Sequence, residues 1–301
     1  MIRTEVDAPI EIHIEIGNPE LVAGSVLDVV IRATAHRDLR VTAADVALVA
    51  KYTYRYCLTG FSVVMSHRYE TVASLTMLPW GHLDSAESVR FPISLLVPAD
   101  SGGTVEGYLA QVGYRVEVRL TMDCAPDLVV SAPITVLTRA RHSADAEPRQ
   151  ASVVERRLAL LAFEDVSLPS VVPGARLTGA LAIAAWRPWT ARTAQVSLIR
   201  RELVRRGPWL GSDPSRNLAA DETQDDRLLT RQTLAEDLTL NPRRIERLPF
   251  TLHVPPTPLA PSTHRDDFTI TWILLGQLNR RWRPGPSVQL ELHAVTAPPW
   301  T

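Results

Sequence analysis

Two arginine-rich stretches are the strongest candidates for binding chemistry in this 301-residue sequence. NPRRIER and NRRWRPG each place several arginines around a turn, and the second adds a tryptophan. Their basic and aromatic residues are Arg243, Arg244, Arg247, Arg280, Arg281, Trp282 and Arg283. Guanidinium groups bind phosphates and carboxylates, and an interleaved ring can stack or anchor in a partner. We predict a partner-binding surface at these residues; the alternative is a pair of solvated hairpin tips, because exposed charges contribute little by themselves.

Signatures of catalysis are missing from the sequence. It contains no GxSxG, HExxH, GxxxxGK[ST] or GxGxxG motif. HRDL at 36–39 copies the start of a kinase catalytic loop, but Ala43 stands where that loop needs asparagine. The eight histidines are scattered, and none stands two or four positions from another. We therefore expect no enzyme activity, no cofactor and no metal site, and keep a site assembled from distant residues as an alternative.

Composition indicates a globular protein with two unlike halves. Hydrophobic residues make up 46% and charged residues 22% of the chain, which suits a folded core. Residues 1–138 hold 10 basic and 16 acidic groups (10 − 16 = −6), and residues 139–301 hold 22 and 17 (22 − 17 = +5). The opposite net charges would help the two halves attract each other or steer different partners; the alternative is drift in surface charge. No nucleic acid is expected.

The compartment is inferred from features that the sequence lacks. The start, MIRTEVDAPIEIHIEIG, has alternating charge where a secretory peptide needs an apolar run, and no run of about 18 apolar residues follows. Cys57 and Cys124 stand far apart, so we predict buried thiols rather than a disulfide framework. The expectation is a cytoplasmic protein.

Internal repetition dominates the organisation of the chain. RFPISLLVP at 90–98 returns as RLPFTLHVP at 247–255. VAGSVLDVVIRA at 22–33 matches VPGARLTGALAI at 172–183, and DVALV at 45–49 matches QVSLI at 195–199, both at a shift of 150. Because the order of the matches is kept while the shift varies with loop length, we interpret the chain as a tandem duplication.

Each copy is predicted to consist of strands. EIHIEI at 11–16, YRVEVRL at 114–120 and VQLELHAV at 288–295 alternate polar and apolar residues with period two. The 23 prolines disfavour long helices, and the helix-like stretch 227–238 is assigned to a strand by its counterpart in the first copy. In RFPISLLVP, Pro92 is expected near the start of a strand and Pro98 at its end, with Ile93, Leu95 and Val97 on one face.

The predicted fold class is all-β: two tandem immunoglobulin-like antiparallel β-sandwich domains of about seven strands each. We place the first domain at 1–138, a linker or hinge at 139–152 and the second domain at 153–301. Residues 205–226 are predicted to be an inserted surface loop, with partner binding as the alternative role.

The order of these motifs resembles the arrestin-like clan. The resemblance rests on the glycine followed by spaced Val and Leu in each copy, then FPISLLVP or LPFTLHVP, then YRVEVRL. It is closest to bacterial sporulation-control arrestin-like proteins, and implies two seven-stranded sandwiches joined by a short hinge. A buried charged cluster of such proteins has no assignable members here; Asp28, Arg176 and Asp266 match it only by residue type.

The resemblance and the missing catalytic motifs together favour a non-enzymatic adaptor or regulatory scaffold. It would bind partner proteins through sheet faces, edge strands or the interdomain cleft. The alternative is a peripheral membrane module whose basic second half docks on anionic lipid.

Overall fold

The structure is a computed structural model of the chain and describes the greater part of it. The described residues are 8–57, 63–77, 80–123, 125–138, 150–153, 158–167, 170–205, 222–256, 260–281 and 284–296. Within these ranges every long regular element is a β-strand and none is a helix. The all-β prediction is confirmed. Residues 139–149 of the predicted linker lie outside the described residues. Its last residues, 150–152, belong to strand β11 (Gln150–Val153).

The chain folds into two compact units. Unit 1 comprises Met1–Tyr54, Met65–Val105 and Gln111–Thr138, and unit 2 comprises Arg55–Val64, Glu106–Ala110 and Arg139–Thr301. Two short segments of the first half thus belong to the second unit, so the second unit is more than the second half of the sequence.

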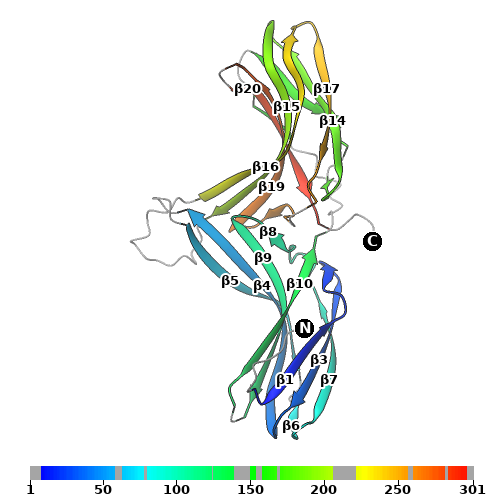
Figure 1. Cartoon of the computed structure of the whole chain (residues 1–301), viewed down its shortest axis with the longest axis vertical. Helices are drawn as coiled ribbons and strands as arrows, with labels where there is room; N and C mark the ends of the chain where they lie inside the picture. The colour runs from blue at the N-terminus through cyan, green and yellow to red at the C-terminus, as the bar shows by residue number, and fades with distance from the viewer. Residues whose placement is uncertain are drawn as a thin grey trace. The chain divides into compact units, whose positions relative to one another are not determined.

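Unit 1 contains a three-stranded and a seven-stranded sheet, coloured blue to green in Figure 1. The strands are β1 (Ile10–Ile16), β2 (Glu20–Val22), β3 (Val26–Ala35), β4 (Leu39–Cys57), β5 (Val63–Met77), β6 (Gly81–Leu83), β7 (Ser88–Leu96), β8 (Val105–Glu106), β9 (Ala110–Met122) and β10 (Leu128–Leu137). The small sheet has the order β1-β3-β7. The large sheet has the order β2-β10-β9-β4-β5, with β6 on β4 and β8 on β9.

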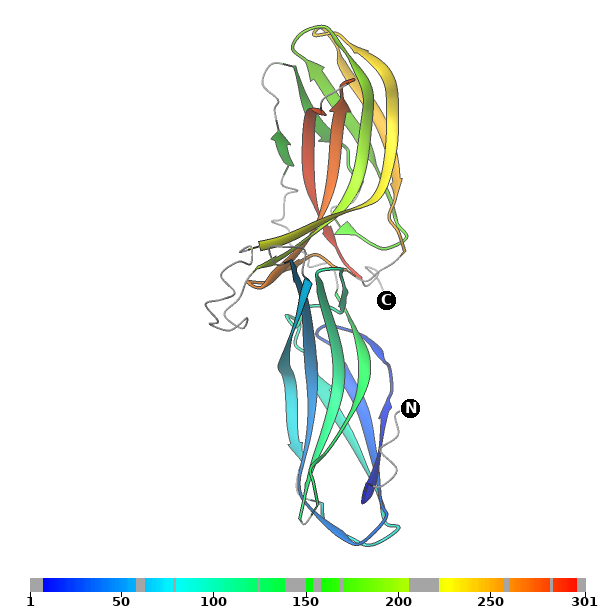
Figure 2. The same ribbon diagram turned by 60° about the vertical axis from the view of Figure 1, so that its left-hand side comes forward.

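Unit 2 repeats this arrangement. Its strands are β11 (Gln150–Val153), β12 (Ala159–Glu164), β13 (Ser170–Val171), β14 (Arg176–Ala185), β15 (Trp189–Arg205), β16 (Glu222–Leu240), β17 (Ile245–His253), β18 (Thr263–His264), β19 (Phe268–Asn279) and β20 (Pro284–Ala294). The sheets are β12-β14-β17 and β11-β20-β19-β15-β16, with β13 on β20 and β18 on β19. Figure 2 shows the long strands β15 and β16 side by side.

Period-two burial explains how these strands form a core. In β9 the burial alternates along the whole strand, from Ala110 to Met122. Between the sheets of unit 2, a side chain at Gly276 of β19 would meet Leu181 of β14 and Phe163 of β12. The inner faces of the two sheets are therefore in contact, and apolar burial at about 25 cal/mol per Å² holds them together.

The repeated RFPISLLVP segment has the same surroundings in both units. Val97 accepts a hydrogen bond from the N–H of Gly24, and Val254 accepts one from Gly174. Both glycines have positive φ, 91° and 79°. The apolar face is buried in both copies, at Ile93, Leu95 and Val97 and at Phe250, Leu252 and Val254. This part of the prediction is confirmed.

Two details of the sequence prediction were wrong. Residues 222–226 belong to β16, which begins at Glu222, because their backbone continues the antiparallel pairing with β15. The part of the predicted loop at 206–221 lies outside the described residues. Pro92 lies in the middle of β7 rather than near its start. It is tolerated there because β7 is an edge strand, where a missing N–H need not break a ladder.

Candidate functional site

Three turns of unit 2 lie at one end of its sheets. Trp189, the first residue of β15, pairs with Leu240, the last of β16. Thr193 pairs with Asn279, the last residue of β19, and Ala184, near the end of β14, pairs with Ile245, the first of β17. The β14–β15, β16–β17 and β19–β20 turns therefore converge, at the top of unit 2 in Figure 1.

The β16–β17 turn presents two of the predicted arginines to solvent. The amide of Arg243 donates to Oδ1 of Asn241 at 3.0 Å, which closes the turn. Nε of Arg244 lies 3.1 Å from Oε1 of Glu246, yet the Arg244 side chain is 75% exposed. Both guanidinium groups remain accessible to a partner.

The β19–β20 turn adds two more. The guanidinium of Arg280 lies over the ring of Trp189, 5.4 Å from its centroid, and Arg281 is exposed. A cation stacked on a tryptophan is held in place while its edge still donates hydrogen bonds. Trp282 and Arg283 lie outside the described residues.

Arg247 is the predicted site residue that the structure separates from this group. It lies inside β17 opposite Ala182, and its Nε is 2.8 Å from Oε2 of Glu164 in β12. Its charge is thus already neutralised across the small sheet.

The sequence interpretation missed the turn between β14 and β15. Trp186 is 64% exposed there, Arg187 is exposed beside it, and Ile245 across the end is 51% exposed. The signal was the string WRPW at 186–189, where two tryptophans and an arginine flank a proline between strands. We name the basic end as the set Trp186, Arg187, Arg243, Arg244, Arg280 and Arg281.

A second feature that the sequence interpretation missed is a buried ion pair in β15. Nη2 of Arg200 lies 2.7 Å from Oε1 of Glu202, and the two side chains are 1% and 0% exposed. The Glu202 carboxylate also accepts hydrogen bonds from the amides of Tyr108, at 3.0 Å, and Leu109, at 2.8 Å. The pair therefore fixes the segment 106–110 within unit 2. Among the described residues, neither Nε nor Nη1 of Arg200 has a hydrogen-bond acceptor.

The three residues that matched a charged cluster by type are not part of this pair. Asp28, Arg176 and Asp266 are all exposed, and Asp28 accepts a hydrogen bond from the hydroxyl of Ser94 at 2.7 Å. Among the described residues of unit 2, the buried charged side chains are instead Arg200, Glu202 and Asp267.

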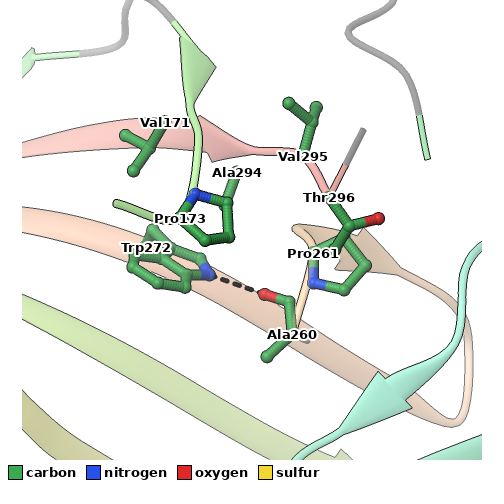
Figure 3. A pocket seen from close by; sticks show the side chains of 8 residues that line it. All are labelled: Val171, Pro173, Ala260, Pro261, Trp272, Ala294, Val295 and Thr296. Carbon is green, nitrogen blue, oxygen red and sulfur yellow. Dashed lines mark hydrogen bonds between the residues drawn. The ribbon is translucent and has the colours of Figure 1, made fainter. Parts of the chain in front are cut away.

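A small apolar hollow of about 10 Å³, roughly the space of one water molecule, lies beside β20 of unit 2 (Figure 3). Its lining is Val171, Pro173, Ala260, Pro261, Trp272, Ala294, Val295 and Thr296. The indole N–H of Trp272 donates to the carbonyl of Ala260 at 2.8 Å and so is already used. The lining contains no ionisable group that could act as an acid or a base.

The residues with catalytic or metal-binding side chains are dispersed. No group of three His, Cys, Asp or Glu side chains that could hold a metal ion occurs in the described part of the chain. His36 and Asp38 of HRDL lie in the turn between β3 and β4, where Oδ1 of Asp38 accepts the amide of Ser85 at 2.8 Å. This contact is that of a turn residue.

No protein-family model matches the chain, and no curated protein sequence matches it. Within the described residues there is no helix long and apolar enough to span a membrane.

Proposed function

We propose that the protein is a non-enzymatic adaptor that docks on an anionic membrane surface through the basic end of unit 2. The observation that carries the proposal is the convergence of five arginines and an exposed tryptophan on three neighbouring turns. A basic side chain near an anionic leaflet contributes about 1 kcal/mol, so five arginines supply up to about 5 kcal/mol before losses in ordering them.

The apolar residues between the arginines favour a membrane over an acidic protein. Trp186 and Ile245 are both more than half exposed. A tryptophan prefers the headgroup region, where its ring is in an apolar setting and its N–H can reach water or phosphate. Turn tips at one end of a sheet can reach a flat surface together, whereas a groove would suit a peptide.

We also propose that the two units are immunoglobulin-like β-sandwich domains in an arrestin-like arrangement. The support is the repeated strand order, in which β1, β3 and β7 correspond to β12, β14 and β17. A parallel partner strand, β2 on β10 and β13 on β20, recurs as well. In this arrangement the units offer sheet edges to partner proteins while the basic end binds lipid, at the cytoplasmic leaflet where anionic lipids concentrate.

Vesicle sedimentation tests the membrane proposal. The protein should pellet with vesicles of phosphatidylcholine and phosphatidylserine at low salt, and binding should fall as salt is raised. The variant R243E/R244E/R280E/R281E should lose binding, and Trp186→Ala should weaken it about tenfold. Vesicles of phosphatidylcholine alone should pellet little protein.

A control of equal net charge separates the site from bulk electrostatics. R37E/R40E/R90E/R119E reverses four exposed arginines of unit 1 and should keep most of the vesicle binding. Equal loss in both variants, or no pelleting of the wild type at low salt, contradicts the proposal. In the second case an acidic protein becomes the better candidate for the basic end.

A further inference from the structure

Strand β5 of unit 1 is an outermost strand with no buried residue. It ends the sheet order β2-β10-β9-β4-β5, at the left of unit 1 in Figure 1. All 15 of its residues are exposed or half-exposed. Met65 is 52% and Tyr69 is 54% exposed. A long edge strand with exposed apolar residues is a template for pairing with another strand.

The sequence of β5 is complementary to itself when one copy is reversed about Tyr69. In that register Tyr69 faces Tyr69 of the other strand. The remaining pairs are Arg68 with Glu70, His67 with Thr71, Ser66 with Val72, and Met65 with Ala73. Opposite charges face each other, and an apolar residue faces an apolar one at Met65. Such cross-strand pairs stabilise an antiparallel sheet.

We propose that the protein forms a symmetric homodimer in which residues 65–73 of β5 pair antiparallel with the same residues of a second copy, with Tyr69 on the two-fold axis. A symmetric interface requires one patch to complement itself, which is the property that residues 65–73 show. The occupant of this edge is therefore a second copy of the chain. The proposal is independent of the membrane function.

Charge supports this register in both strands at once. Nη2 of Arg68 lies 2.9 Å from Oε2 of Glu70 within one strand, because residues two apart share a face. In the dimer each arginine faces the glutamate of the other copy, so two arginines and two glutamates alternate in a square. A register shifted by two residues breaks this alternation.

Backbone geometry permits the same register. Along an antiparallel strand, the N–H and C=O of alternate residues point to opposite edges. If the N–H and C=O of Tyr69 point away from β4, the two Tyr69 residues form a hydrogen-bonded pair on the two-fold axis. If they point toward β4, the two residues form a non-hydrogen-bonded pair, and the axis can pass through this pair as well. In the dimer the outer backbone edges of the two β5 strands pair with each other over nine residues. An interface of this size is small enough to make the dimer weak and concentration-dependent.

Charge exchange is the direct test, read by sedimentation equilibrium of the full chain. The wild type should show a monomer–dimer equilibrium. Arg68→Glu and Glu70→Arg should each raise the dimer Kd at least about tenfold, because like charges then face each other twice. The exchange R68E/E70R should restore dimerisation, and an equimolar mixture of the two single variants should form heterodimers.

The mixture also controls for folding. Arg68 lies over the ring of Tyr52, 5.0 Å from its centroid, so a single variant could lose stability. A variant that had failed to fold would not form heterodimers with its complement. Arg227→Glu, at an exposed position of β16 in unit 2, should leave the Kd unchanged.

Disulfide trapping tests the register of the two β5 strands in the dimer. In a C57S/C124S background, Tyr69→Cys should form an intermolecular disulfide on mild oxidation, because facing Cα atoms of paired strands are about 4.5–5.5 Å apart. Thr71→Cys faces His67 and should crosslink much more slowly. A wild type that stays monomeric up to about 1 mM, single variants as dimeric as the wild type, or faster crosslinking at residue 71 would each overturn the proposal.

Discussion

The two units repeat one strand order but fill the same core position with different chemistry. At the shift of 150 that aligns 45–49 with 195–199, Ala50 and Tyr52 of β4 correspond to Arg200 and Glu202 of β15. All four are buried. Unit 1 thus builds this position from a methyl group and an aromatic ring, and unit 2 from an ion pair. The comparison shows that the fold does not need the charges.

The hydrogen bonds of Glu202 indicate the role of the buried charges in unit 2. Its carboxylate accepts the amides of Tyr108 and Leu109, which lie 94 and 93 positions away in sequence. A side chain at Gly107 would collide with the carbonyl of Ala110 and with Oε2 of Glu202. The ion pair therefore fastens a segment of the first half of the chain into unit 2.

The edge strands of the two large sheets also differ between the units. β5 and β16 end corresponding sheets, but Oε1 of Gln232 in β16 accepts the amide of Thr251 in β17 at 2.8 Å. β16 also carries register shifts against β15 and several acidic residues. Bulges and charges protect an edge from pairing. The edge of unit 2 is thus closed by its own side chains, which makes β5 the better surface for a second copy.

The largest expected effect comes from removing the charge of Glu202. Glu202→Gln leaves the Arg200 cation buried without a counter-ion, and breaking a buried pair in this way costs about 3–5 kcal/mol. We expect that loss in the free energy of unfolding of unit 2, measured by urea denaturation. Amide hydrogen exchange at Tyr108 and Leu109 should accelerate as well.

A double variant isolates the uncompensated charge. R200M/E202Q removes the cation and keeps an amide oxygen as acceptor, so it should cost less than half of what Glu202→Gln costs. If the single variant costs less than about 1 kcal/mol, the pair is not the buried fastening that we describe. Equal costs for the single and the double variant would assign the loss to the backbone contacts instead.

An intermediate effect tests whether the two units are equivalent at their repeated turn. Gly24→Ala and Gly174→Ala each place a side chain at positive φ, which costs about 1–2 kcal/mol. The costs should agree, because a new Cβ meets Ala99 only at ordinary contact distance, 3.5 Å, at Gly24 and nothing within 4 Å at Gly174. Thermal unfolding measures both.

The matched control is Gly113→Ala. Gly113 lies in β9 outside the positive-φ region, with nothing within 4 Å of a new Cβ. Alanine should be neutral or slightly stabilising there, since glycine weakens a strand. If Gly24→Ala destabilised the protein no more than Gly113→Ala does, the positive φ of the turn would not be the reason that glycine is required at position 24.

Local patterns explain why much of the fold could be predicted from the sequence. Period-two alternation marks strands such as β9, and Gly24 and Gly174 recur with the segment that bonds to them. The sequence analysis did not predict the start of β16, because the acidic residues 222–226 are typical of a loop. Their strand pairing depends on β15, which a local pattern does not include.

The candidate sites depended on contacts between distant segments. The arginines at 243–244 and 280–281 were predicted by type, but their convergence follows from the registers of β15 with β16 and β19. Arg200 and Glu202 fall in phase with Leu198 and Val204 on the core face of β15. That phase was a usable signal for a buried ion pair, whereas the backbone amides that it binds could not be found from spacing.

The smallest expected effect is a pH dependence of stability that unit 2 has and unit 1 lacks at corresponding positions of β4 and β15. Lys51 of β4 lies over the Tyr69 ring, 5.9 Å from its centroid, and the corresponding Arg201 of β15 instead forms two 2.8 Å hydrogen bonds to Asp226. These bonds hold the pKa of the Asp226 carboxyl below its ordinary value of 3.8, against a smaller opposing effect of partial burial. The pair therefore stabilises the fold above about pH 4, and this contribution is lost as the pH falls through the lowered pKa.

Comparing Asp226→Asn with the wild type measures that contribution. The stability difference should be constant above about pH 5, at less than about 1 kcal/mol because both side chains are over a third exposed to solvent, and should shrink below pH 4. For Lys51→Ala the stability difference from the wild type should be the same across this acid range, because the contact between Lys51 and Tyr69 involves no carboxylate. A pH-independent difference for Asp226→Asn would show that the paired arginine and aspartate do not titrate as a unit, and that unit 2 resembles unit 1 at this position.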